Sequence, residues 1–152
     1  MEESLKRSSS FTRIIMPETM TPKEVIDFIN ATRNGIIATV RKDGSPHAAW
    51  NPVAYVEDKL YTYADPHSVC YSNLRRDGRV SVAIASGDKA VFMEGEADEV
   101  GQVSKLIDTL LSKILSQVKD WIPMSSYNYA SLGECQASIF EIRLAKILSY
   151  KS

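Results

Sequence analysis

Length, composition and charge narrow the classes of protein to which this chain can belong. Its 152 residues are 44% hydrophobic, which is enough for one domain with its own core. The 18 Lys and Arg residues are balanced by 19 Asp and Glu residues, so the formal net charge is -1. Because this balance does not attract a polyanion, we expect neither nucleic acid nor a membrane surface as a partner.

Cysteine content and hydropathy favour a cytoplasmic protein. Cys70 and Cys135 are the only cysteines, and neither belongs to a Cys-x-x-Cys pair, so no disulfide framework and no zinc site is predicted. No apolar run approaches the roughly 20 residues that span a bilayer. Residues 1–15 also lack the apolar segment of a signal peptide, so we expect no export.

The chain is predicted to consist of a flexible N-terminal tail, residues 1–20, and one domain, residues 21–152. The tail mixes charged residues with a serine run and has no sustained period. The domain should begin with a helix, because Thr21 suits an N-cap and Glu24 can close a capping box. This helix is predicted to end near Asn34-Gly35, since either residue can take the left-handed conformation.

A two-residue hydrophobic period predicts strands along much of the remaining chain. The predicted strands are residues 35–41, 47–56, 60–63, 80–85, 89–97 and 138–145. Short turns separate several of them, so neighbouring strands should run antiparallel and close into a barrel. A short helix is predicted between Asp65 and Gly78.

A longer helix is predicted over residues 100–118. Its apolar residues recur at spacings of three and four, from Leu106 to Val118. We interpret this stripe as cover for the core, because its few charges do not form the basic face of a membrane-surface helix. Residues 120–133 have no clear period and are predicted to be irregular.

Side chains that could bind a ligand or take part in a reaction occur on the second predicted strand and on the short helix. Trp50 on the strand is open to two interpretations, a core residue or the wall of a ligand site. His67 and Cys70 are three residues apart on one helical face, but two ligands do not complete a metal site, so no metal is predicted. Cys70 would be a low-pKa thiol if it lay in the first helical turn beside Arg75.

Several motifs occur in a fixed order along the chain. They are G-I-I-A-T-V-R-K-D-G-S-P-H, L-Y-T-Y-A, N-L-R-R-D-G-R-V-S-V-A-I, V-F-M-E-G-E-A and I-F-E-I-R. This order resembles the pyridoxamine 5'-phosphate oxidase-like family of split-barrel flavoproteins over residues 21–150. The resemblance implies a mainly β (α+β) fold, with a six-stranded antiparallel split β-barrel and flanking helices. It also implies a homodimer that binds FMN in two clefts at the dimer interface.

The resemblance implies a set of cofactor-binding residues on two strands and the short helix. The set is Trp50, Asn51, Pro52, Val53, Tyr63, Ala64, His67, Ser68, Cys70, Asn73, Arg75 and Arg76. Family members that bind FMN tightly often carry Ser-Arg-Lys where this chain has Ser68-Val69-Cys70. Members closest to the true oxidase carry Arg and Lys where it has Ala48 and Val53, so the authentic oxidase reaction is not expected.

A phosphate needs charge-assisted donors, which leaves few candidates in this chain. They are Arg75, Arg76, His67, Ser68 and the backbone amides that begin the short helix. The predicted function is therefore that of an FMN-dependent oxidoreductase acting on a small molecule, with a nicotinamide as electron donor. Two alternatives stay open: a non-enzymatic flavin or haem binder, and a deazaflavin-dependent reductase of the same fold. No catalytic acid or base is assigned.

Overall fold

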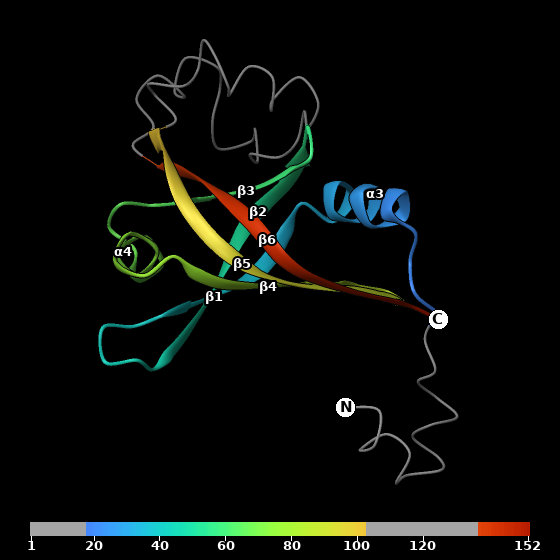
Figure 1. Cartoon of the computed structure of the whole chain (residues 1–152), viewed down its shortest axis with the longest axis horizontal. Coiled ribbons are helices and arrows are strands. Elements are labelled where there is room, and N and C mark those ends of the chain that lie inside the picture. The colour runs from blue at the N-terminus through green and yellow to red at the C-terminus, as the bar shows by residue number, and fades with distance from the viewer. Residues whose placement is uncertain (1–17, 103–136) are drawn as a thin grey trace, which may run out of the picture.

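The computed structural model describes residues 18–102 and 137–152. In chain order its elements are α3 (Pro22–Thr32), β1 (Asn34–Val40), β2 (Pro46–Val56), β3 (Lys59–Ala64), α4 (Val69–Arg76), β4 (Arg79–Ser86), β5 (Lys89–Gln102) and β6 (Ser138–Lys151). Figure 1 shows the two helices on opposite sides of the strands. Residues 1–17 of the predicted tail, residues 103–118 of the predicted long helix and the predicted irregular segment all lie outside the described residues.

The strands form a closed antiparallel barrel in the order β1-β2-β3-β6-β5-β4. The first part of β2, up to Pro52, pairs with β1, whereas its last residues, Val53 to Val56, pair with β3. In the same way, β6 pairs with β3 only from Ser138 to Ile142 and with β5 along its whole length. Strand β3 therefore closes only one end of the barrel, and the predicted split-barrel fold is confirmed.

The core lies where the alternating strand residues point inward. Ile37, Val53, Leu60, Val91 and Phe140 are each 0% exposed, and they come from five different strands. Full burial of such a side chain contributes about 1.5–3 kcal/mol. The two-residue period that predicts the strands is thus the same pattern that fills the barrel.

Helix α3 begins as predicted and ends earlier than predicted. The Thr21 hydroxyl accepts a hydrogen bond from the backbone N–H of Glu24 at 3.2 Å, as an N-cap does. Arg33, and not Asn34 or Gly35, takes the left-handed conformation that ends the helix, with φ at 70°. Asn34 already belongs to β1, where it pairs with Pro52, so the helix has to stop before it.

Residues 100–102 correct the predicted start of the long helix. They continue β5, because Gly101 pairs with Ile139 and Gln102 pairs with Ser138. Strand β6 likewise runs past residue 145 to Lys151, where it pairs with Lys89 and bridges to Glu18. The presence of a long partner strand decides both boundaries, and this information is not contained in the local sequence.

No helix among the described residues is long and apolar enough to cross a membrane.

Candidate functional site: the junction of β2 and α4

One side-chain contact joins strand β2 to helix α4. The amide Nδ2 of Asn51 donates a hydrogen bond to Cys70 Sγ at 3.4 Å. Trp50, the preceding residue, lies on the outer face of β2 and is 63% exposed. Two of the predicted residues, Asn51 of the strand and Cys70 of the helix, therefore meet, and the exposed Trp50 is the neighbour of Asn51 along the strand.

Ser68 caps the N-terminus of α4, and its only hydroxyl proton is already donated within the chain. It accepts a hydrogen bond from the backbone N–H of Tyr71 at 3.1 Å and donates one to the carbonyl of Asp65 at 2.7 Å. The Asp65 carboxylate in turn accepts a hydrogen bond from the backbone N–H of His67 at 2.8 Å. The approach to the helix thus presents a carboxylate, which disfavours a phosphate at the same spot.

A polar cluster lies beneath the last turn of α4. Asn73 is 2% exposed, and its Nδ2 donates to the hydroxyl of Thr39 at 3.0 Å. The Arg76 guanidinium donates to Asn73 Oδ1 at 3.3 Å and to the backbone carbonyl of Val40. His47 pairs with Thr39 across the strands, and its Nδ1 is buried without a hydrogen-bond partner. Arg76 therefore fastens the helix to β1.

Arg75 is held on the other side of the helix. Its Nε lies 3.0 Å from Glu99 Oε2, and its guanidinium carbon lies 5.5 Å from the centroid of the Tyr71 ring. Ser138 donates a hydrogen bond to the other oxygen of Glu99 at 3.0 Å. Both arginines predicted to meet a phosphate thus already contact acceptors of the chain itself.

The Cys70 thiol does not have the character of a reactive thiolate. It is 1% exposed, and burial raises its pKa while the Asn51 hydrogen bond lowers it to a smaller extent. Cys70 does lie in the first turn of α4, but its pKa is raised, so that position does not make it a low-pKa thiol. Loss of water around the sulfur disfavours the charged thiolate, and this effect is the larger of the two.

Burial divides the predicted cofactor-binding set into two groups. The buried group lies beneath the surface and can only support a ligand site from below. It consists of Pro52, Val53, Ala64, Cys70 and Asn73. The side chains that reach the surface are Trp50, Asn51, Tyr63, His67, Ser68, Arg75 and Arg76. The set is spread over β2, the end of β3 and both ends of α4, and the structure brings Asn51 of β2 into contact with Cys70 of α4.

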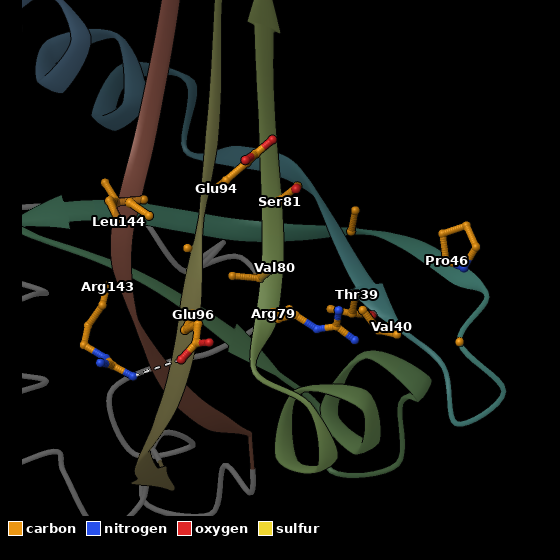
Figure 2. Close-up of a pocket in the computed structure, with 14 residues that line it drawn as sticks. Thr39, Val40, Pro46, Arg79, Val80, Ser81, Glu94, Glu96, Arg143 and Leu144 are labelled. Atoms are coloured by element: carbon orange, nitrogen blue, oxygen red, sulfur yellow. Dashed lines mark hydrogen bonds and ion pairs between the residues drawn. The ribbon is translucent and has the colours of Figure 1, made fainter.

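A cleft lies on the outer face of the barrel, near the start of β2. This cleft has a volume of about 760 Å³ and lies between the β1–β2 hairpin and strands β4, β5 and β6. Its charged lining residues are Arg79, Glu94, Glu96 and Arg143, and Figure 2 shows Arg79 extending from β4 toward Thr39 and Val40. None of the residues of the predicted set lines the cleft.

Most charges of the cleft are neutralised by neighbours. Arg143 lies 3.4 Å from Glu96 and 2.7 Å from Asp98, and Arg79 lies 2.7 Å from Asp77. Sequence reasoning missed this cleft, although the exposed positions of β4 and β5 alternate with the buried ones as the strand period requires. The two-residue period predicts whether a side chain points to the inside or the outside of the barrel. It does not predict which strands lie side by side, and the cleft depends on that arrangement.

The described residues contain no group of three His, Cys, Asp or Glu side chains that is arranged to hold a metal ion.

The closed six-stranded barrel, whose third strand closes only one end, defines this protein as a split barrel. The family model described as pyridoxamine 5'-phosphate oxidase matches residues 21–150, and the chain belongs to this family. No curated protein is detectably similar in sequence.

Solved structures support the same fold. A conserved hypothetical protein from Mycobacterium tuberculosis is 24% identical with a TM-score of 0.70, covering 90% of this chain and 88% of its own. An FAD-binding protein from Mesorhizobium loti is 22% identical with a TM-score of 0.63, covering 91% and 99%. The haem storage protein HutZ from Vibrio cholerae is 16% identical with a TM-score of 0.66, covering 86% and 94%.

Proposed function

We propose that this chain binds a flavin, with FMN as first choice, against the outer part of β2 and the start of α4. The observation that carries the proposal is the Asn51–Cys70 contact, which joins β2 to α4 one residue away from the exposed Trp50. An exposed indole offers a flat apolar surface to a ring system. Membership of the family and the similarity to an FAD-binding protein support the same assignment.

The residues present suit the ring of such a ligand better than its phosphate. Trp50 and the half-buried Asn51 combine apolar area with an amide, which is the combination that binds a planar, polar-edged ring. Arg75 and Arg76 can meet a phosphate only in addition to the acceptors that they already contact. We therefore expect the flavin ring to contribute more to the affinity than the phosphate does.

The activity that follows is transfer of electrons from a nicotinamide to a small acceptor, in the cytoplasm. A bound flavin supplies the redox chemistry, while the protein positions the ring and excludes water. Trp50 orients the ring, Asn51 offers it a hydrogen bond, and α4 closes one end of the site. No acid or base of the chain is required by this assignment.

Absorption spectra and a binding titration test the proposal. The purified protein is expected to show flavin bands or to quench added FMN, and Trp50→Ala should weaken binding by about tenfold or more. Ile147→Ala is the matched control, because Ile147 is also an exposed apolar side chain, at 47%, and lies beside α3 instead. A Soret band would identify a haem binder. Equal losses of FMN affinity in both variants would show that the flavin ring does not contact Trp50.

A further inference from the structure

Strands β1 and β4 separate near the end of β1. Their last paired residues are Ala38 of β1 and Ser81 of β4. The backbone N–H of Arg41 donates to the carbonyl of Ser45 across the β1–β2 hairpin at 2.8 Å. Because successive residues of a strand direct their backbone groups to opposite edges, the carbonyl of Val40 points away from β2, toward β4. No residue of β4 is paired with Val40, so the ladder is open at this point.

Two arginines approach this β1–β4 opening, which lies between Val40 and Arg79. Arg76 of α4 donates a hydrogen bond to the carbonyl of Val40. Arg79 begins β4, and Figure 2 shows its side chain extending toward Thr39 and Val40. The Arg79 guanidinium also contacts Asp77, with 2.7 Å between Nη2 and Oδ2. A guanidinium has five N–H donors, so both arginines keep donors that no described residue accepts.

Arg41 and Lys42 add two cations at the same end of β1. Arg41 lies two residues past Thr39, whose hydroxyl accepts a hydrogen bond from α4, so Arg41 is on the side of β1 that faces this helix. Neither Arg41 nor Lys42 forms an ion pair with a described residue. The carboxylates nearby are Asp43 and Asp77, and both accept hydrogen bonds within their own turns. With the two arginines above, four cations thus stand against two carboxylates, an excess of two positive charges.

We propose that the β1–β4 opening binds a phosphate monoester. A dianionic phosphate balances the excess of two positive charges, and its oxygens accept the free N–H groups of Arg76 and Arg79. Arg41 and Lys42 attract the phosphate from the hairpin side. Val40 and Arg79 also line the cleft of about 760 Å³, so the organic part of the molecule lies in that cleft.

The proposed function, on which this step rests, supplies a molecule with such a phosphate. One form of the nicotinamide donor, NADPH, carries a 2'-phosphate on its adenosine ribose, whereas NADH does not. Pro46, which is paired with Val40, lies four residues from Trp50 along β2, a distance of about 13 Å. The 2'-phosphate is remote from the nicotinamide, so it occupies the opening while the nicotinamide reaches a flavin ring at Trp50. The chain therefore prefers NADPH to NADH.

Calorimetric titrations with adenosine 2'-monophosphate and with adenosine test the phosphate site without any flavin. The unaltered protein should bind the phosphate ester about tenfold or more tightly than adenosine, because only the ester carries the dianion. Arg41→Gln should reduce this difference by roughly threefold to tenfold, and added salt should also reduce it. Lys23→Gln removes an exposed charge at the start of α3 and should leave the difference unchanged. Equal affinities for the two probes, or equal effects of the two substitutions, would overturn the inference.

Donor preference identifies the molecule that carries the phosphate. In the FMN-loaded protein, NADPH should reduce the flavin at a roughly tenfold lower concentration than NADH, and Arg41→Gln should remove most of this preference. Weaker binding of FMN by Arg41→Gln, with riboflavin binding unchanged, would assign the phosphate to FMN and overturn the donor assignment. Absence of FMN binding by the unaltered protein would refute the flavin assignment, and the titration with adenosine 2'-monophosphate would still decide the phosphate site.

Discussion

Arg75 Nε lies 3.0 Å from Glu99 Oε2, and this ion pair joins α4 to the end of β5. The Arg75 side chain is 59% exposed and the Glu99 side chain 29%, so the pair lies at the surface. Surface pairs contribute little to stability, typically about 0–1 kcal/mol. The main consequence concerns the FMN site proposed above, because there Glu99 would compete with the ligand phosphate for Arg75, whereas Arg76 already contacts β1.

Glu99→Gln is therefore expected to tighten FMN binding. The neutral amide no longer competes for Arg75, and a released charge-assisted contact increases affinity by roughly threefold to tenfold after solvent screening. Riboflavin, which lacks the phosphate, should bind with unchanged affinity. Asp98→Asn removes the same charge one residue away, where the carboxylate pairs with Arg143 at 2.7 Å, and should have no such effect. Titrations of flavin fluorescence compare FMN and riboflavin binding by the unaltered protein and the two variants.

Val69→Arg should tighten FMN binding by about tenfold, because it places a cation where the side chain is 47% exposed at the start of α4. Val69→Gln provides a long side chain without the charge and should give no gain. The gain should shrink at high salt. Cys70→Lys is not an equivalent change, since Cys70 is 1% exposed and a buried ammonium should lower the free energy of unfolding by roughly 3 kcal/mol or more. Unchanged FMN affinity in a folded Val69→Arg protein would place the phosphate elsewhere.

Alkaline pH should destabilise the fold through Cys70. Burial raises the pKa of its thiol, so the folded state retains the proton at a pH where the unfolded chain releases it. Stability therefore falls as pH rises above about 8.5, the usual thiol pKa. Urea unfolding of Cys135→Ser at pH 7.5 and 9.5 should show this loss. Adding Cys70→Ala should reduce the pH dependence of the free energy of unfolding. If this pH dependence did not change, a group other than Cys70 would be its cause.

Acid should weaken the turn between α4 and β4. The Arg79 guanidinium and the Arg79 backbone N–H lower the pKa of Asp77 to about 2. Because this folded-state pKa lies below the unfolded value of about 3.9, the carboxylate contributes stability above that pH and loses it as the pH falls toward 2. Asp77→Asn should therefore differ most from the unaltered protein near neutral pH and least near pH 2. A constant difference across that range would contradict the assigned cause.

Gly95→Ala should destabilise the barrel by roughly 1–3 kcal/mol, because a Cβ at this position would overlap the backbone carbonyl of Arg143. Strands β5 and β6 shift register here, between Glu94 and Gly95, which brings the two backbones close. Gly44 is the matched control. It has φ at 87° and open space around its Cβ position, so Gly44→Ala should cost only about 1 kcal/mol from backbone conformation. Thermal unfolding of both variants compares the two costs.

The sequence by itself determined the strands, the first helix cap and the family. Alternation such as that of Val80, Val82 and Ile84 is a local pattern, and it is sufficient to assign both the strand and its buried face. Thr21 and Ser68 act as the N-caps because capping depends on residues within one turn. The order of motifs was enough to indicate the split barrel.

Tertiary structure decided what depends on partners distant in the chain. The continuation of β5 through residues 100–102 requires β6 opposite it, and the burial of Cys70 requires β2 beside α4. The sequence does not indicate that Arg75 has an ion-pair partner, because Glu99 is 24 residues away along the chain. In the fold, Glu99 lies 3.0 Å from Arg75. The exposed side chains of Trp50, Ile36 and Phe92 are also scattered along the chain, and only the register of β2, β1, β4 and β5 places them in one line across the outer face.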